Sequence, residues 1–236
     1  MLLLALDSTA VAASVCLMED GVILAESYQN TKQTHSQTLM PMVQFVLQCA
    51  RRRVEDLDLL AVSAGPGSFT GVRIGISCVK GLAFPQNKPC CGVSVLQAMA
   101  ENLAHMDGLV CAVMDARCRQ VYQALFRVKN GEVTRLCEDR AVTLTQLRED
   151  LEKMGGSFVL VGDGAKLCMQ APELAGLSLQ VAPEPLRMQR ASGVALAAAK
   201  AFKEGKTVSA EELLPVYLRL PQAQRELKKR MEGARS

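Results

Sequence analysis

Three apolar segments at the start of the chain restrict its possible folds more than any other feature. Residues 2–7 form a continuous apolar run that ends at Asp7, as expected of a strand covered on both faces. Residues 11–18 and 22–28 form two further runs, and the Glu-Asp-Gly turn between them is typical of a β-hairpin. The sequence therefore predicts that the chain opens with three strands in meander order.

The following residues alternate between helical and strand-like patterns. We expect helices over residues 36–52, 70–83 and 95–103, and strands over residues 57–64 and 90–93. The resulting order β-β-β-α-β-α-β-α is typical of the ribonuclease-H-like lobes of actin-like (ASKHA) proteins. We therefore predict a two-lobed α/β fold of this class, in which each lobe is a mixed sheet flanked by helices.

The second half of the chain echoes the first half. Its expected strands cover residues 109–115, 121–128, 132–137 and 158–161, and its expected helices cover residues 144–154 and 191–203. The predicted domains are a first lobe of residues 1–107, a smaller second lobe of residues 108–205, and a C-terminal segment of residues 206–236. We expect this last segment to return to the first lobe.

Composition and charge exclude several classes of protein. With 49% hydrophobic and 22% charged residues the chain is globular, and no apolar stretch approaches the length of a membrane span. The nine cysteines show no C-x-x-C spacing, which favours reduced thiols and a cytoplasmic location, with no membrane partner. Five basic residues lie between Arg225 and Arg235, and the rest of the chain is electrically balanced. This balance argues against a broad surface for direct RNA binding.

Two turns could contact a nucleotide. One is Asp7-Ser8-Thr9, which follows the first strand, where actin-like kinases place a carboxylate and phosphate-binding hydroxyls. The other joins a strand to a helix whose first amides can bind an anion. The candidate nucleotide-binding residues are Asp7, Ser8, Thr9, Gly65, Gly67 and Ser68. Because no glycine directly follows Thr9, an ordinary turn at a strand end is an open alternative.

Several motifs, in order across nearly the whole chain, resemble those of a known family. They are Leu6-Asp7-Ser8-Thr9, His35-Ser36 ahead of Leu39-Met40-Pro41, the run from Ala64 to Gly75, Asp115-Ala116-Arg117, and Leu214-Pro215-Val216-Tyr217-Leu218-Arg219. On these motifs the chain resembles the TsaB (YeaZ-like) branch of the TsaD family. The resemblance implies a two-lobed actin-like fold. It also implies a complex with a catalytic TsaD-like subunit and a TsaE-like ATPase, which moves a threonylcarbamoyl group onto the adenosine beside the tRNA anticodon.

The same resemblance argues against catalysis by this chain. The catalytic relatives carry two metal-binding histidines, and the matching positions here are Val95 and Met99, whose side chains do not hold such a metal. The sequence has no G-x-S-x-G or H-E-x-x-H motif, and it contains only two histidines, His35 and His105. We expect no catalytic residue, no metal ligand and no peptidase activity. No cofactor is firmly expected, and a nucleotide in a vestigial cleft or at an interface of the complex stays open.

The predicted helix over residues 36–52 carries apolar residues in two stripes. Leu39, Val43 and Val46 recur at the spacing of one stripe, and Met42, Phe45 and Cys49 at the spacing of a second. A wide core-facing helix would explain both stripes, whereas a partner surface would explain the second. The resemblance favours the partner surface, because family members dimerise through this helix with TsaD or with themselves. The expected interface comprises His35, Leu39, Met42, Val43, Phe45, Val46 and Cys49.

Two functions follow from these patterns. The favoured hypothesis is a non-catalytic scaffold that binds and activates a TsaD-like subunit, meets a TsaE-like ATPase and tRNA through the complex, and forms a homodimer when alone. The alternative is an actin-like enzyme that binds or hydrolyses a nucleotide with Asp7 and the glycine turn of residues 65–71.

Overall fold

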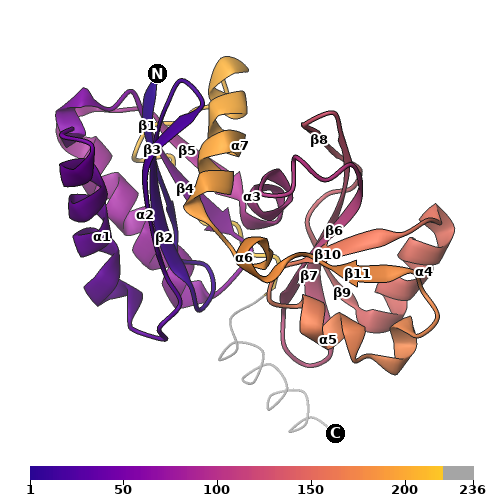
Figure 1. Cartoon of the computed structure of the whole chain (residues 1–236). Coiled ribbons are helices and arrows are strands. Elements are labelled where there is room, and N and C mark those ends of the chain that lie inside the picture. The colour runs from indigo at the N-terminus through magenta and orange to yellow at the C-terminus, as the bar shows by residue number, and fades with distance from the viewer. Residues whose placement is uncertain (220–236) are drawn as a thin grey trace, which may run out of the picture.

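The computed structural model describes residues 1–219, which form two lobes side by side (Figure 1). Each lobe contains one mixed sheet with helices packed on it, as the sequence predicts. The basic residues between Arg225 and Arg235 lie outside the described residues. None of the helices within residues 1–219 is long and apolar enough to cross a membrane.

The first sheet has the strand order β3-β2-β1-β4-β5. Its strands are β1 (Leu2–Asp7), β2 (Ala13–Glu19), β3 (Val22–Gln29), β4 (Leu59–Gly65) and β5 (Cys90–Ser94). β1 lies at the centre, pairing antiparallel with β2 and parallel with β4. All of its residues are buried, which accounts for its uninterrupted apolar run.

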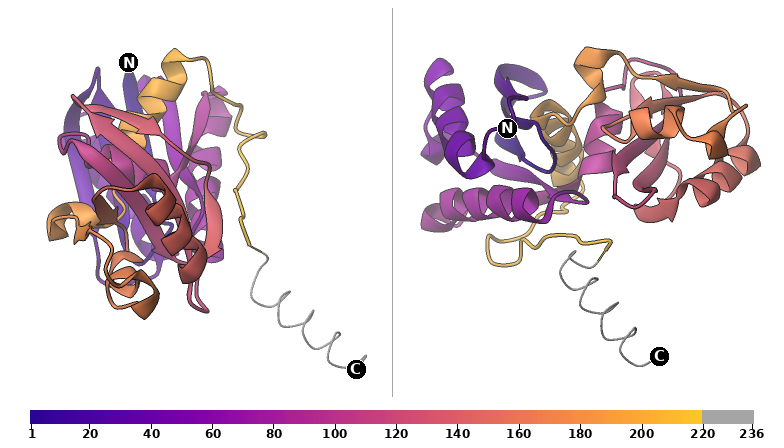
Figure 2. Two further views of the ribbon diagram at one scale, coloured as in Figure 1. Left: turned by 90° about the vertical axis from the view of Figure 1, so that its right-hand side faces the viewer. Right: turned by 90° about the horizontal axis from the view of Figure 1, so that it is seen from below.

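Helices cover both faces of the first sheet. α1 (His35–Cys49) and α2 (Phe69–Ala83) lie on one face, and α7 (Ala191–Lys203) lies on the other, between this sheet and the second lobe (Figures 1 and 2). Two short 3₁₀ helices, η1 (Val54–Asp56) and η2 (Phe84–Gln86), follow α1 and α2. The result is a three-layered lobe with an apolar core on each side of the sheet.

The second sheet has the order β11-β10-β6-β7-β8, and β9 also pairs with β7. Its strands are β6 (Gly108–Asp115), β7 (Gln120–Lys129), β8 (Glu132–Arg135), β9 (Arg140–Thr143), β10 (Phe158–Val161) and β11 (Leu179–Val181). The accompanying helices are α3 (Val95–Glu101), α4 (Leu144–Met154), α5 (Ala165–Met169), η3 (Pro172–Leu174) and α6 (Glu184–Arg187). β10 pairs parallel with β6, so both strands end at the same edge of the sheet.

The placement of α7 differs from the predicted division of the chain. The helix was expected in the second lobe of residues 108–205, yet its buried side chains pack on the first sheet and on α3. The helix approaches α3 closely at Gly193, where an added Cβ would lie 2.0 Å from the carbonyl oxygen of Ala98. Lys200 of α7 also donates to the buried Glu101 carboxylate of α3 at 2.8 and 2.9 Å. Small side chains therefore let a late helix return to the first lobe.

The segment after α7, residues 206–219, is here named the C-terminal strap. Val208 forms an isolated antiparallel bridge with Cys90 of β5, and Leu213 lies in the core beneath α2. Further along, the backbone amide of Val216 donates to the carbonyl oxygen of Ala64 at 2.8 Å. In Figure 2 the strap, coloured yellow, runs along the α2 side of the first lobe and toward the second lobe.

The contact between α7 and α3 gives a prediction for stability. Replacing Gly193 by alanine forces a methyl group into a backbone carbonyl, so Gly193→Ala should lower the free energy of unfolding by about 1–3 kcal/mol. Gly81→Ala is the matched control, because this exposed α2 glycine has no atom within 4 Å of its added Cβ. That variant should gain roughly 0.5–1 kcal/mol. Urea unfolding of both variants checks the pair, and equal behaviour would contradict the close approach.

Candidate functional site

A cleft of about 370 Å³ lies between the two lobes. The turn after β1 and the start of α2 form one wall, and the ends of β6 and β10 with part of β7 form the other. Its lining residues are Thr9, Ala10, Val11, Gly67, Ser68, Phe69, Met114, Asp115, Ala116, Arg117, Tyr122 and Asp163. Three of the predicted nucleotide-binding residues, Thr9, Gly67 and Ser68, are therefore at this cleft.

Asp7 lies at the end of β1 as a fully buried carboxyl group. One oxygen accepts hydrogen bonds from the backbone amide of Thr9 at 2.9 Å and from its hydroxyl at 2.8 Å, and the other accepts one from Ser63 Oγ. Burial raises the pKa of Asp7 above its ordinary value, against the lowering effect of the hydrogen bonds from Ser63 and Thr9. One oxygen therefore holds the turn after β1, and the other joins the end of β1 to β4.

The glycine turn packs directly on the backbone of the turn after β1. The Ser68 amide donates to Thr9 O at 2.8 Å, and Ser8 Oγ donates to Gly71 O at 2.9 Å. A Cβ at Gly67 would lie 2.5 Å from Thr9 O, and one at Gly71 would lie 2.0 Å from Ser8 O. The glycines thus allow two backbones to touch. The Ser68 amide, which was expected to bind an anion, instead donates its hydrogen bond to Thr9.

Gly65 has a different role from the other predicted residues. Its φ of +128° lies in the region that favours glycine, and an added Cβ would lie 2.3 Å from the carbonyl oxygen of Val216. The residue is therefore shaped for the C-terminal strap and does not line the cleft. Of the six predicted residues, Asp7, Ser8, Thr9 and Ser68 belong to one hydrogen-bonded unit. Gly67 packs closely against this unit, and Gly65 packs against Val216 of the strap.

Two carboxylates of the second lobe lie on the opposite wall, and sequence reasoning gave them no role. Asp115 ends β6 and Asp163 follows β10, so the parallel pairing of these strands brings both to one edge. Burial raises the pKa of Asp163, the nearby Asp115 raises it further, and the hydrogen bond from Gln189 Nε2 (3.3 Å) acts against this shift. The Gly-Asp-Gly sequence after a predicted strand was the available signal. The two carboxylates make the inner cleft unfavourable for a phosphate.

The turn after β6 has an unusual backbone. Arg117, Cys118 and Arg119 have φ values of +66°, +54° and +55°, a left-handed conformation that is costly for residues other than glycine. Asp115 accepts a hydrogen bond from the Arg117 amide at 2.7 Å, and Arg119 forms a bidentate pair with Glu173 at 2.6 and 2.7 Å. Surrounding contacts therefore hold a strained, exposed turn at the cleft mouth.

An aromatic pair stands beside this turn. Phe69 of α2 and Tyr217 of the C-terminal strap stack with ring centroids 4.2 Å apart and an angle of 15° between the rings. Arg73 Nε donates to the Tyr217 hydroxyl at 2.8 Å. Arg219 donates through one guanidinium nitrogen to the carbonyl oxygens of Ala116 and Arg117. The strap therefore connects the two lobes at the mouth of the cleft.

Some of the residues predicted to form an interface on α1 are buried in the structure, and others are exposed. Leu39, Met42, Val43 and Val46 are buried in the core of the first lobe, so they are not available to a partner, and the wide core-facing helix explains them. Phe45 is 55% exposed, and Cys49 is exposed as well. His35 is half-buried and donates through Nε2 to the carbonyl oxygen of Ala10 at 2.7 Å, so it holds the turn after β1.

The two positions that the sequence resemblance sets against metal-binding histidines lie in apolar surroundings. Val95 and Met99 of α3 are buried in the core of the second lobe. Within the described part of the chain, no three His, Cys, Asp or Glu side chains gather in a way that could hold a metal ion. Burial raises the pKa of the Cys16 and Cys168 thiols to about 12, which makes both poor nucleophiles.

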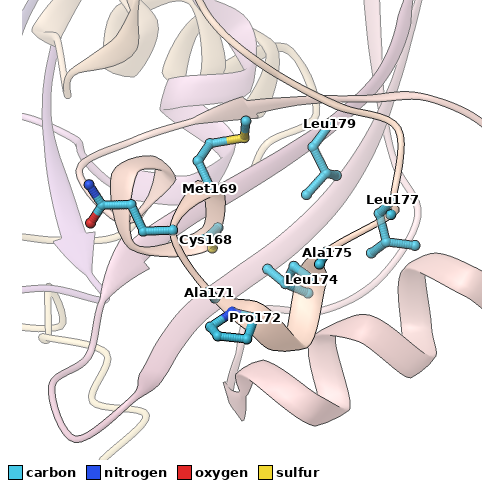
Figure 3. A pocket seen from close by; sticks show the side chains of 10 residues that line it. Cys168, Met169, Ala171, Pro172, Leu174, Ala175, Leu177 and Leu179 are labelled. Atoms are coloured by element: carbon cyan, nitrogen blue, oxygen red, sulfur yellow. The ribbon is translucent and has the colours of Figure 1, made fainter.

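A second hollow of about 320 Å³ lies in the second lobe, between α5, η3 and the start of β11 (Figure 3). The side chains of Met169, Leu174, Leu177 and Leu179 line it, together with Cys168. Its lining residues carry no charged group and no activated nucleophile. This hollow is therefore not suited to nucleotide chemistry.

The chain was compared with known protein families and with curated proteins. The family model for TsaD, described as tRNA N6-adenosine threonylcarbamoyltransferase, matches residues 22–227. The TsaB protein of Escherichia coli K12 is 35% identical over 222 residues, which is 93% of this chain and 95% of that protein. The chain belongs to the TsaB branch of the TsaD family. The TsaB protein of Bacillus subtilis 168 is 32% identical, over 95% of this chain and 96% of that protein.

Solved structures agree with membership of the TsaB branch. YeaZ from Pseudomonas aeruginosa superimposes with a TM-score of 0.80 at 30% identity, over 92% of this chain and 99% of that chain. The ethanolamine utilization protein EutJ from Carboxydothermus hydrogenoformans superimposes with a TM-score of 0.51 at 14% identity, over 82% and 88% of the two chains. The latter likeness concerns the fold alone. The predicted two-lobed actin-like fold is confirmed.

The buried Asp7 gives a prediction about pH. Because its folded-state pKa lies above the ordinary 3.8, the folded protein binds the proton more tightly, and Asp7 costs stability as pH rises from about 4 towards 7. Asp7→Asn removes this cost. The unfolding free energy of the variant minus that of the parent should therefore increase as pH rises across that range. Urea unfolding at a series of pH values measures the difference.

Glu132→Gln controls for the loss of a carboxylate, because Glu132 is exposed on β8. This substitution should leave the pH dependence unchanged. If magnesium stabilises the parent and Asp7→Asn removes that effect, the structural role of Asp7 is overturned and the carboxylate holds a metal instead.

Proposed function

We propose that this chain is a non-catalytic subunit that binds and orders a TsaD-like partner in tRNA threonylcarbamoyladenosine biosynthesis. Its family membership supports a role in that process, because the TsaB relatives carry this function in their names. The observation that carries the non-catalytic part is the turn after β1. Both oxygens of its only carboxyl group, Asp7, are taken up by Thr9 and Ser63.

Three further features support a scaffold rather than a catalyst. The Ser68 amide is already bonded to Thr9, and the opposite cleft wall presents Asp115 and Asp163 where a polyphosphate would have to bind. The helix face that carries metal-binding histidines in catalytic relatives is represented by buried Val95 and Met99. The first feature engages an anion-binding amide within the fold, the second sets carboxylates opposite a bound phosphate, and the third places apolar side chains where a metal would need ligands.

The partner surface is proposed on the outer face of α1. Phe45 presents a large apolar side chain to solvent, with Cys49 one turn further along. Exposed glutamines at positions 44 and 48 neighbour them on the helix, so uncharged polar side chains lie beside the apolar centre. A TsaD-like subunit would bury Phe45, and in its absence a second copy of this chain would use the same face. A TsaE-like ATPase and tRNA would join through the resulting complex.

The alternative is a nucleotide-binding or nucleotide-hydrolysing enzyme. Its support is the interlobe cleft itself, which has the Ser68 hydroxyl and the Arg117 guanidinium at its border. We expect magnesium-ATP at millimolar concentration to leave the melting temperature of the isolated chain unchanged, because the anion-binding amide and the carboxylate are engaged. Differential scanning fluorimetry measures this, and a concentration-dependent rise with ATP turnover would favour the enzyme.

Substitution of Phe45 tests the partner surface. Phe45→Glu places a charge at the centre of the proposed apolar contact and should weaken the complex with a TsaD-like partner by at least about 2 kcal/mol, roughly thirtyfold. Size-exclusion chromatography with light scattering, on the chain alone and mixed with the partner from the same organism, measures both assemblies. The melting temperature should stay close to that of the parent, because the side chain is exposed.

The matched control is Phe202→Glu. Phe202 lies on α7, which covers the opposite face of the first sheet, and its side chain is 37% exposed. This variant should form the complex normally. Val46→Glu is unsuitable as a test, although Val46 belonged to the predicted interface, because it would unfold the core. A complex that tolerates Phe45→Glu as well as Phe202→Glu would remove α1 from the interface.

A further inference from the structure

We propose that the mouth of the interlobe cleft binds an unpaired stretch of RNA. The binding surface, here named the rim cluster, consists of Phe69, Arg73, Arg117, Tyr217 and Arg219. This inference rests on the proposed function, since it assigns to this subunit a direct contact with the RNA on which the complex acts. Outside residues 225–235 the sequence is electrically balanced, which argues against a broad basic surface there, so the contact is a local one.

The first part of the rim cluster is a preformed stacking platform. Phe69 and Tyr217 are already stacked, and the Arg73 guanidinium carbon lies 6.0 and 5.7 Å from the two ring centroids. These nearly equal distances place Arg73 beside the pair, so that it does not cover a ring face. Tyr217 retains 37% exposure. An unpaired base can therefore extend the stack, while Arg73 stands beside it at the position where a backbone phosphate would bind.

Contacts made by the residues before and after Tyr217 hold the platform in place. Before Tyr217, Val216 is fixed to β4 by its hydrogen bond to Ala64 and by the close approach of Gly65. After Tyr217, Arg219 is fixed to the second lobe through the carbonyls of the turn after β6. The ring therefore loses little conformational freedom on binding, which favours recognition by stacking.

The second part of the rim cluster supplies positive charge. Within residues 1–219 the Arg117 guanidinium forms no ion pair, whereas the neighbouring Arg119 is neutralised by Glu173. The left-handed turn of residues 117–119 exposes Arg117 at the cleft mouth, beside Arg219. Asp115 and Asp163 line the same cleft and disfavour phosphates inside it. Charge therefore directs a phosphodiester chain along the rim, with its bases toward Tyr217.

An apolar protein segment is the competing occupant of this surface. Leu214 and Val216 are exposed on the same strap, and a protein partner could bury them. RNA is favoured because Arg73 lies beside the exposed ring, while Arg219, two residues further along the strap, reaches the turn that carries Arg117. Positive groups next to a stacking ring match the alternation of phosphate and base.

Fluorescence anisotropy with a fluorescein-labelled RNA stem-loop tests the inference. The full-length chain is titrated alone and in complex with its TsaD-like partner, and a fully paired RNA duplex of the same composition serves as the comparison probe. Tyr217→Leu should weaken binding of the stem-loop about tenfold or more and leave duplex binding unchanged. Tyr217→Phe keeps the ring and loses only the bond to Arg73, so it should retain most of the affinity.

Charge is tested with a second pair of variants. Arg117→Gln should weaken stem-loop binding and reduce the slope of log affinity against log salt by about one. Arg53→Gln is the control, because Arg53 is an exposed arginine directly before η1 that does not line the cleft and, among the described residues, pairs only with the exposed Glu55. Melting temperatures of all variants show whether the strap is still in place. Arg117→Gln removes no described hydrogen bond of the side chain, so its effect is independent of folding.

The outcomes separate this inference from the proposed function. Loss of stem-loop binding in Tyr217→Leu with an intact partner complex supports the rim cluster. Equal affinity of the parent, Tyr217→Leu and Arg117→Gln, or no binding by the parent in either state, overturns it. Loss of the partner complex in Tyr217→Leu with unchanged RNA binding also overturns it and assigns the strap to a protein. Failure of Phe45→Glu to disturb the complex bears on the proposed function alone.

Discussion

The contact between the turn after β1 and the start of α2 determines how the first-lobe wall of the cleft is built. Two stretches of backbone touch there, because Gly67 and Gly71 leave no side chain between them and the carbonyls of Thr9 and Ser8. Beneath the contact, the Asp7 carboxyl group accepts three hydrogen bonds within the fold. In a nucleotide-binding member of the fold such groups would face a ligand, whereas here the protein uses them for itself.

The relative position of the lobes depends on elements that come late in the chain. α7 packs between the first sheet and α3, where Gly193 allows a close approach and Lys200 neutralises the buried Glu101. The C-terminal strap then crosses from the first lobe to the turn after β6 through Arg219. Both connections join the two lobes, so any partner that moves one lobe must work against them. A fixed arrangement of lobes suits a scaffold, which has to present a constant surface.

Sequence patterns predicted the strands with continuous apolar runs well. β1 and β10 are recognisable because both faces of each strand are buried, and the hairpin turn defines β2 and β3. β9 and β11 were missed, because each of these short strands contains only two apolar residues, too few to give a pattern. The lobe of α7 could not be predicted, since periodicity shows that a helix has a buried face but not which sheet that face meets. The pairing of Tyr217 with Phe69 likewise joins residues that only the fold brings together.

The division of α1 shows how an interface can be overestimated from periodicity. At about 100° per residue, the buried Leu39, Met42, Val43 and Val46 fall within one arc, which is the ordinary width of a core face. A chain poor in aromatic residues fills such a face with several aliphatic side chains. In the sequence, their spacing looks like two separate apolar stripes. Phe45 lies outside this arc and is exposed, so packing in the core does not explain its large apolar side chain. Since a few central residues carry most of the energy of an interface, one exposed phenylalanine on a helix anchored by five buried side chains is sufficient to form its centre.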